Sequence, residues 1–438
     1  MLTLSISTLK KNLEKFWGRW AYKLFKMMSE LSCFKAYDIR GEIDVNINAD
    51  IVYRIGRAIS QHFKAKSVVV GYDARETSPS YASAAAQGLQ DSGSNVINIG
   101  LAGTEEMYWA VSEFKACAGI EVTASHNPIN YNGMKIVKSA SKPLDEESDF
   151  KVIKKLAEAA KFPSIGHRGK VFNRSVEARS AYVNRVLSFV NIAELRPLKI
   201  VVNCGNGAAG PTFDEIAKKL TKANAPLDFI RINHNPDHTF PNGIPNPLLA
   251  KNHYATAKVV KEVGADFGIA FDGDFDRCFF FTKTGQFVSG EYVVSMLASI
   301  FLEREAGAKI VHDPRLIWNT LDIVKKYKGE CIQSKSGHTF IKEKMRKENA
   351  IYGGEMSAHH YFRDFFYCDS GMIPWLLVME LINKSGLPLS KLVDNMIEQY
   401  PSPGEINFSV KDPKDVMRKV RDHFEPFAKN LNEEDGLS

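Results

Sequence analysis

Residues 119–135, GIEVTASHNPINYNGMK, decide the first part of the fold. Ile120 and Val122 are β-branched and apolar, which predicts the end of a half-buried strand. Turn-forming side chains follow, and Pro128 is suited to the first turn of a short helix. Because backbone N–H groups at such a junction attract anions, Ser125 lies where a phosphate would be stabilised. The same pattern also fits a serine that only caps a turn.

Apolar, strand-like segments alternate with helical patterns through most of the chain. The strand-like segments are 68–70, 96–99, 120–122, 198–202, 227–232, 267–271, 309–311, 330–333 and 351–352. Helices are predicted over 80–90, 371–383 and 413–431, and a last strand over 405–410. This alternation predicts α/β domains with mixed, largely parallel sheets.

The length of 438 residues exceeds what one hydrophobic core supports. We therefore predict several domains. They are a basic extension at 1–30, three α/β domains at 31–175, 176–281 and 282–400, and a partial domain at 401–438.

Charge and cysteine content exclude several classes of protein. Residues 1–30 hold six lysines and arginines against two glutamates, which accounts for +4 of the net charge of +6. The nearly balanced remainder does not predict a nucleic-acid surface. Six cysteines without a C-x-x-C pair favour a reducing, cytoplasmic setting over a disulfide framework or a zinc site.

The first thirty residues differ in character from the rest. Apolar side chains between Phe16 and Phe25 would line one face of a basic amphipathic helix, which suits a membrane surface or a partner groove. Charged residues interrupt the segment too often for a membrane-spanning helix. The alternative is that translation starts at Met27 or Met28, so that this segment has no function.

A second chemistry-bearing stretch is DGDFDR, residues 272–277. Asp272, Asp274 and Asp276 follow a predicted strand at alternating positions, so their carboxylates can converge on a hard cation such as Mg²⁺. An EF-hand is excluded, because loop positions six and twelve would be Arg277 and Lys283. A solvated acidic turn is the alternative.

A third stretch, GGEMSAHH, spans residues 353–360. Its two glycines allow a ligand to approach the backbone closely. Glu355 can accept hydrogen bonds from two neighbouring hydroxyl groups, and Ser357 can donate or accept. Taken alone, the stretch also fits an ordinary loop.

Residues 205–210, GNGAAG, match G-x-G-x-x-G after a predicted strand and before a helix. A dinucleotide-dependent oxidoreductase is therefore an alternative. The acidic residue expected near the end of the next strand is missing, because Asp228 lies near that strand's start. Tight packing explains the glycines equally well.

The first stretch resembles the active-site serine loop of the α-D-phosphohexomutases. The resemblance rests on Thr123–Pro128, Tyr131–Gly133 and Lys135, and from Phe34 onward the chain is most similar to the bacterial phosphomannomutase branch. It implies three similar α/β domains and a smaller fourth α+β domain around a central cleft. It also implies that Ser125 carries the transferable phosphoryl group.

The resemblance further implies roles for individual residues. A phosphoserine oxygen at Ser125 would join the three aspartates as a ligand of Mg²⁺, and Arg40 would pair with the phosphoserine. Lys135 and His359 are candidates for proton transfer. The implied substrate contacts are Tyr37, Arg277, Arg315, His338, Glu355 and Ser357.

The implied reaction interconverts mannose 6-phosphate and mannose 1-phosphate, with a hexose 1,6-bisphosphate as intermediate and activator. The alternative is phosphoglucomutase activity at the same site. The expected partners are small hexose phosphates, and the product would supply GDP-mannose and surface polysaccharide.

The resemblance weakens at the C-terminus. The family's fourth domain carries an Arg-Ser-Asn-Thr-type loop that binds the non-transferred phosphate, and nothing after Glu405 matches it. The sequence therefore predicts an incomplete fourth domain and a truncated, impaired mutase.

Overall fold

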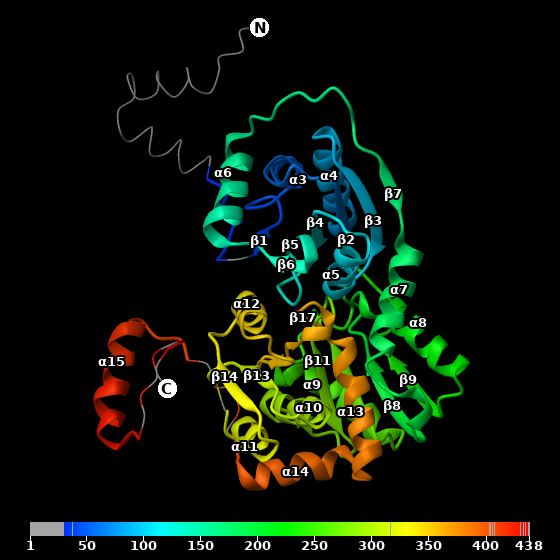
Figure 1. The fold of residues 1–438 in the computed structure, drawn as a ribbon, viewed down its shortest axis with the longest axis vertical. Coiled ribbons are helices and arrows are strands. Elements are labelled where there is room, and N and C mark those ends of the chain that lie inside the picture. The colour runs from blue at the N-terminus through cyan, green and yellow to red at the C-terminus, as the bar shows by residue number, and fades with distance from the viewer. Residues whose placement is uncertain are drawn as a thin grey trace.

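The computed structural model describes residues 30–436, apart from Tyr37, Leu316, Pro403, Glu405, Asn407, Asn430, Asn432 and Glu434. The predictions for residues 1–29 and for Tyr37 lie outside the described residues. Three sheets organise the rest, the first in the upper part of Figure 1 and the other two side by side below it. The predicted class of three α/β domains with mixed sheets is confirmed.

The first domain has a seven-stranded sheet in the order β1-β5-β4-β2-β3-β7, with β6 paired to β5. Its strands are β1 (Ile39–Glu42), β2 (Ser67–Tyr72), β3 (Asn95–Leu101), β4 (Ala118–Val122), β5 (Tyr131–Lys138), β6 (Lys142–Pro143) and β7 (Val171–Asn173). Its helices are α3 (Ala49–Phe63), α4 (Ser78–Asp91), α5 (Thr104–Glu113) and α6 (Lys151–Ala159). Val69 shares a core with α5, whereas Val68 and Val70 share another with α3 and α4. Helices therefore cover both faces of this sheet.

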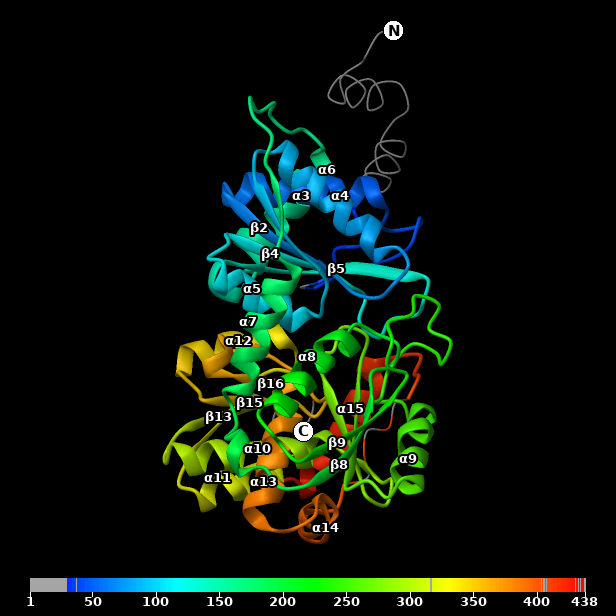
Figure 2. The same cartoon turned by 90° about the vertical axis from the view of Figure 1, so that its right-hand side faces the viewer.

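Helix α7 (Ser175–Leu187) leads from the first domain into the second, as Figure 2 shows. The second sheet has the order β12-β11-β10-β8-β9. Its elements are β8 (Leu198–Asn203), α8 (Ala209–Lys222), β9 (Leu227–Ile232), α9 (His253–Glu262), β10 (Phe267–Phe271), β11 (Cys278–Thr282) and β12 (Phe287–Val288). Because β12 pairs with β11, this domain extends beyond the boundary predicted after residue 281.

The third sheet has the order β14-β13-β15-β16-β17. Its elements are α10 (Gly290–Arg304), β13 (Lys309–His312), α11 (Trp318–Lys326), β14 (Glu330–Gln333), α12 (His338–Glu348), β15 (Tyr352–Gly354), β16 (His360–Phe362), β17 (Cys368–Asp369), α13 (Met372–Ser385) and α14 (Leu389–Gln399). Trp375 on α13 packs on Phe213 of the second domain, with 5.6 Å between ring centroids. In the described part of the chain, no helix has the length and apolar character to cross a membrane.

The last described helix, α15 (Pro413–Phe424), begins at Asp412, whose side chain accepts hydrogen bonds from the next turn. It confirms the first part of the helix predicted over 413–431. The strand predicted over 405–410 is wrong for its described residues, which are irregular. Ile406 and Phe408 are 64% and 81% exposed, so no neighbouring strand covers them.

Each sheet contains one hairpin in which a buried parallel strand turns back as an antiparallel strand. We name the three connecting segments the serine loop (123–130, β4 to β5), the aspartate loop (272–277, β10 to β11) and the glutamate loop (355–359, β15 to β16). The short helix predicted at Pro128 is wrong, because the chain there makes turns and enters β5. Hairpins also explain why parallel pairings do not predominate in these sheets.

The glycine-rich segment 205–210 packs against the aspartate loop. The Ala208 N–H donates to the Gly273 carbonyl at 3.0 Å, and a Cβ atom at Gly207 would lie 2.7 Å from that oxygen. The Asn206 and Gly207 N–H groups donate to other backbone carbonyls. The amides that would hold a diphosphate are already bonded, so this segment positions a loop and the dinucleotide interpretation is wrong.

Replacing Gly207 by alanine is expected to lower the free energy of unfolding by about 1–3 kcal/mol, because the new methyl group would overlap the Gly273 carbonyl. Urea denaturation measures the effect. Gly166→Ala is the matched control, since a Cβ atom there meets nothing within 4 Å. Equal stability of the two variants would contradict this account of the packing.

Candidate active site

The three loops meet at backbone distance. A backbone bridge pairs Arg277 of the aspartate loop with His359 of the glutamate loop. A Cβ atom at Gly273 would lie 2.6 Å from the Ser125 carbonyl oxygen, so only glycine allows the serine loop to approach the aspartate loop this closely. The hairpins therefore bring residues from all three domains into one site.

Ser125 occupies a strained position at the centre of the serine loop. Its φ of +47° is in the left-handed region, and its side chain is buried. Its N–H donates to Thr123 Oγ1 at 2.8 Å, and its Oγ donates to Asp272 Oδ2 at 2.8 Å. His126 Nδ1 lies 3.2 Å from the same Oγ. The hydroxyl group is therefore aimed at the aspartate loop.

The aspartates form a compact carboxylate cluster. Ligand atoms of Asp272, Asp274 and Asp276 lie within 4.8 Å of one another, and the three side chains are at most 1% exposed. The Oδ1 atoms of Asp274 and Asp276 are buried without a hydrogen-bond partner among the described residues. Burial and the Asp274 charge raise the pKa of Asp276 well above its usual range. A hard dication such as Mg²⁺ binds carboxylate oxygens, and these buried oxygen atoms have no other partner among the described residues.

Basic side chains already offset part of this charge. Lys135 Nζ lies 2.8 Å from Asp274 and also donates to Asp276. Burial alone would lower the pKa of Lys135, but the two carboxylates raise it, so the side chain stays an ammonium ion. Arg277 donates to Asp272 through Nε and Nη2, at 2.9 and 2.7 Å. These contacts leave the cluster able to accept one further cation.

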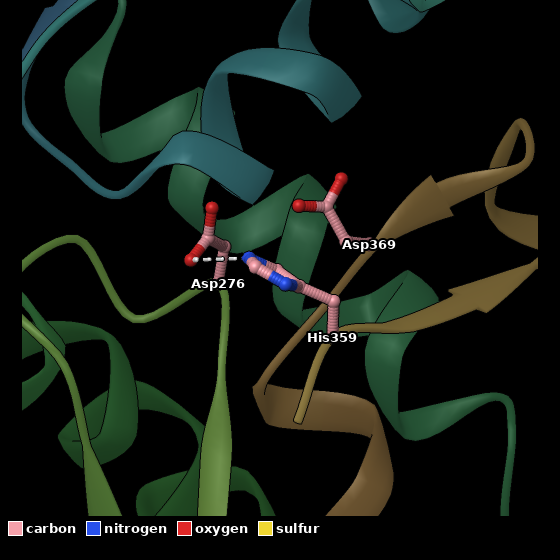
Figure 3. A group of neighbouring side chains, drawn as sticks. All are labelled: Asp276, His359 and Asp369. Atoms are coloured by element: carbon pink, nitrogen blue, oxygen red, sulfur yellow. Dashed lines mark ion pairs between the residues drawn. The ribbon is translucent and has the colours of Figure 1, made fainter. Parts of the chain in front are cut away.

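His359 connects the aspartates to the glutamate loop. Its Nε2 lies 3.9 Å from Asp276 and its Nδ1 lies 3.1 Å from Ser357 Oγ. Figure 3 shows its ring between Asp276 and Asp369, which comes from the third sheet. Burial and the Arg277 charge hold the pKa of His359 well below its usual value. Its imidazole is therefore neutral.

Asp369 is the remaining carboxylate of this group and is already paired. Lys342 Nζ lies 2.5 Å from its Oδ1, and both side chains are 1% exposed. The ring of Tyr108 in the first domain stacks against the same ammonium group at 4.1 Å. The group of Asp276, His359 and Asp369 offers a cation two carboxylates and an imidazole, whereas the aspartate loop offers three carboxylates, the oxygen ligands that Mg²⁺ prefers.

The glutamate loop also contributes a buried carboxylate to the site. Glu355 is buried and accepts hydrogen bonds from the Gly337 N–H at 2.7 Å and from the Tyr361 hydroxyl. Burial raises the pKa of Glu355 to about 7. Arg315 lies beside it, oriented by Asp313 Oδ2 at 2.6 Å from its Nη2. An anionic acceptor and a cation therefore share one wall.

A cavity of about 350 Å³ lies between these walls. The predicted residues that line it are Arg40, Ser125, Lys135, Arg277, Arg315, His338, Glu355, Ser357 and His359. Asp272, Asp274 and Asp276 are buried behind Ser125. Arg40 lies close to the serine loop, where it donates to the Thr123 carbonyl. Of the predicted site residues, Tyr37 alone falls outside the described residues.

Five further residues line the cavity that were not predicted to act there: Asp38, His126, Asn127, Ser336 and Gly337. Four of them lie next to a predicted residue or within a quoted motif and Ser336 lies two positions before His338, so sequence proximity was an available signal. Asp38 Oδ1 lies 3.6 Å from His338 Nε2, a contact between domains that no local pattern reveals. Arg277 and burial lower the pKa of His126 to about 3, so this ring is neutral.

The family description "Phosphoglucomutase/phosphomannomutase, alpha/beta/alpha domain" matches this chain three times. Domain I matches residues 32–163, domain II matches 180–285 and domain III matches 289–400. The chain belongs to this family. The predicted resemblance and the predicted isomerase class are thereby confirmed.

Individual relatives agree with this assignment. The chain is similar to the phosphomannomutase of Salmonella montevideo, with 51% identity over 94% of this chain and 90% of the relative. It is also similar to the solved structure of a phosphoglucomutase/phosphomannomutase family protein from Burkholderia thailandensis. That likeness has 30% identity and a TM-score of 0.79, and covers 93% of this chain and 88% of that one.

The fold also extends to distant enzymes. The N-acetylphosphoglucosamine mutase of Aspergillus fumigatus, solved in complex with GlcNAc-6P and magnesium, has a TM-score of 0.54 at 13% identity and covers 90% of this chain and 88% of its own. The same enzyme was solved with glucose 1,6-bisphosphate, with a TM-score of 0.55 and coverage of 92% and 88%. At this identity the likeness shows the fold.

Replacing Asp274 by asparagine is expected to weaken Mg²⁺ binding more than about 10-fold. The reason is that one of three converging charges disappears. Loss of a residue that only supports a metal ligand already weakens binding by about 10-fold or more. Isothermal titration calorimetry measures the affinity directly. Asp313→Asn is the control, because that carboxylate is equally buried but pairs with Arg315. Unchanged affinity in the Asp274 variant would rule out this cluster as the metal site.

Proposed function

We propose that the chain is a phosphomannomutase that interconverts mannose 6-phosphate and mannose 1-phosphate through a phosphoserine at Ser125 and a hexose 1,6-bisphosphate. The observation that carries the proposal is the 2.8 Å hydrogen bond from Ser125 Oγ to Asp272 on the wall of the cavity. It places a hydroxyl group against a carboxylate cluster, with hydroxyl-binding groups of the glutamate loop in the same cavity. Relatives named phosphomannomutase support the choice of sugar.

The reaction begins when the P–O bond to Ser125 Oγ breaks and a P–O bond forms to the free hydroxyl of the bound hexose phosphate. The proton of that hydroxyl passes to a base, and Ser125 Oγ takes up a proton as phosphorus leaves it. The bisphosphate then turns over within the cavity. Its other phosphoryl group returns to Ser125 Oγ, which gives up its proton, and the sugar oxygen left behind takes up a proton. Such transfers depend mainly on positioning and charge neutralisation.

Mg²⁺ held by Asp272, Asp274, Asp276 and a phosphoserine oxygen would neutralise charge on the transferring group. Arg40 and Arg277 add positive charge from the protein itself. A guanidinium group binds phosphate oxygens in pairs, which fixes the orientation as well as the charge of the phosphoserine.

Lys135 and His359 are the proposed pair for proton transfer. Their pKa values are shifted in opposite directions, the ammonium of Lys135 being stabilised and the imidazole of His359 being held neutral. Both side chains line the cavity beside Ser125, which is the reason for proposing them, and each would need the charge of a bound phosphate or metal ion to bring its pKa closer to the working pH.

The sugar ring is proposed to lie against the glutamate loop, where Glu355 accepts from its hydroxyl groups and Ser357 adds a polar contact. Arg315 and His338 would bind the non-transferred phosphate or nearby hydroxyl groups, and the resemblance adds Tyr37 to this set. The arrangement does not by itself separate mannose from glucose, so phosphoglucomutase activity is the second candidate.

We further propose Mg²⁺ and catalytic amounts of a hexose 1,6-bisphosphate as cofactors. The magnesium and bisphosphate complexes of a distant relative support this choice. A cytoplasmic location and a role in supplying GDP-mannose remain proposals. All six cysteines are unpaired thiols, which suits a reducing compartment.

The test of the proposed function is mutase turnover by the full chain, followed by phosphorus NMR with mannose 1-phosphate, Mg²⁺ and a trace of hexose 1,6-bisphosphate. Mannose 6-phosphate is expected to accumulate, and glucose 1-phosphate in a parallel assay measures the second activity. Ser125→Ala is expected to abolish both reactions, because the variant lacks the hydroxyl oxygen that is proposed to carry the phosphoryl group. Appreciable turnover by this variant would exclude the phosphoserine.

The pH dependence of KM should report Glu355. Its carboxyl pKa of about 7 means that the acceptor is lost as the pH falls from 8 to about 6, so KM for mannose 1-phosphate is expected to rise over that range. Glu355→Gln should have a higher KM at pH 8. The substrate phosphate also titrates near pH 6 and affects both enzymes. The quantity to follow is therefore the KM of Glu355→Gln divided by the KM of the wild type at each pH. A ratio that stays constant with pH would contradict the assignment.

A further inference from the structure

Arg75 lies against the serine loop and binds four backbone carbonyl groups, three in the loop and one at the start of β5. Its Nη2 donates to Ser125 O at 2.9 Å and to Asn127 O at 2.6 Å. Its Nη1 donates to Pro128 O at 2.9 Å and to Tyr131 O at 3.0 Å. The side chain is 2% exposed. No other described side chain donates as many hydrogen bonds to the backbone of this segment.

Asp73 connects the same arginine to the backbone N–H of the serine. Its Oδ1 accepts from the Arg75 N–H at 3.0 Å, and its Oδ2 accepts from Thr123 Oγ1 at 2.7 Å. The Thr123 hydroxyl in turn accepts from the Ser125 N–H at 2.8 Å. The amide and the carbonyl of Ser125 are thus both held by one buried ion pair and one threonine.

This support is needed because the left-handed backbone of Ser125 is unfavourable for a residue with a side chain. Such a conformation persists only where the surrounding structure holds it in several places. Phe240 of the second domain packs over the Arg75 guanidinium, with 5.9 Å from Cζ to the ring centroid. The arginine is therefore enclosed between the loop and a second domain.

We propose that Arg75 is a positioning residue for phosphoryl transfer, a role that rests on the proposed function. By holding four carbonyl groups at once, it fixes the loop so that Ser125 Oγ stays aimed at Asp272. The planar guanidinium has five donors in a fixed arrangement, whereas a lysine ammonium has three on a flexible chain. Lysine keeps the charge beside Asp73 but cannot reproduce the four contacts.

The first experiment compares Arg75→Lys with Arg57→Lys. Arg57 is a matched control in the same domain, where its side chain bonds to Tyr53, Ser92 and Pro163 away from the cavity. Because a misplacement of about 1 Å can cost about 100-fold in rate, kcat of Arg75→Lys is expected to fall about 100-fold. KM for mannose 1-phosphate should change by less than about 2-fold, since the sugar contacts lie on the third domain.

A purely structural role of Arg75 predicts a change in stability without a change in kcat. Folded Arg75→Lys would then keep the wild-type kcat, and only its thermal unfolding midpoint would fall, as in Arg57→Lys. That result would overturn the proposal.

A second pair of variants keeps the proposal testable if Arg75→Lys fails to fold. Thr123→Val removes the hydroxyl that joins Asp73 to the Ser125 N–H, while Thr123→Ser retains it. We expect the valine variant to lose kcat and the serine variant to keep most of it. Equal kcat values in the two variants would overturn the positioning network.

A third measurement separates this proposal from the proposed function. Hydrogen exchange of a peptide covering 120–135, read by mass spectrometry, should be faster in Arg75→Lys than in Arg57→Lys. If the wild type shows no mutase turnover, the proposed function fails, but this comparison still reports on the loop. Identical exchange in the two variants would overturn the role of Arg75.

Discussion

The site depends on three carboxylates that are buried close together. With ligand atoms within 4.8 Å, each pair repels by about 3 kcal/mol at an effective dielectric constant of about 20. Such a cluster is stable only if compensating charge is built around it, which is the position of Lys135 and Arg277. The compensation is incomplete, as the unpartnered Oδ1 atoms of Asp274 and Asp276 show for the described residues. That shortfall suits a bound dication, which would in turn neutralise charge on a phosphoryl group during transfer.

One local geometry delivers the parts of this site. In each domain a buried parallel strand ends, turns tightly and returns as an antiparallel neighbour, and the turn carries the functional side chains. The strands are buried on both faces, so the turns are anchored by the cores of their domains. Glycines at the contacts between loops allow backbone to lie against backbone, as at Gly207 and Gly273. Side chains with opposite charges can then meet across domain boundaries without long, mobile connections.

Much of this was readable from the sequence, and the exceptions have physical causes. Strand periodicity and turn residues located the sheets, and three aspartates at alternating positions located the carboxylate cluster, because both signals are local. The helix expected at Pro128 was wrong, since proline also fits the turn of a hairpin. The last strand failed because a strand needs a partner, which Phe408 lacks. Arg75 could not be identified from the sequence, because its significance comes from contacts with a segment about 50 residues away.

The hydrogen bond between Ser125 and Asp272 has a consequence for how the chain acquires its site. It joins positions 147 residues apart, in the sheets of two different domains. Closing so long a connection is entropically costly until both domains are formed, and docking of preformed domains is slower than folding within one. Secondary structure should therefore appear well before the hydroxyl group reaches the aspartates. We expect assembly of the cleft to come late in folding, so that a newly made chain forms its secondary structure before its active site.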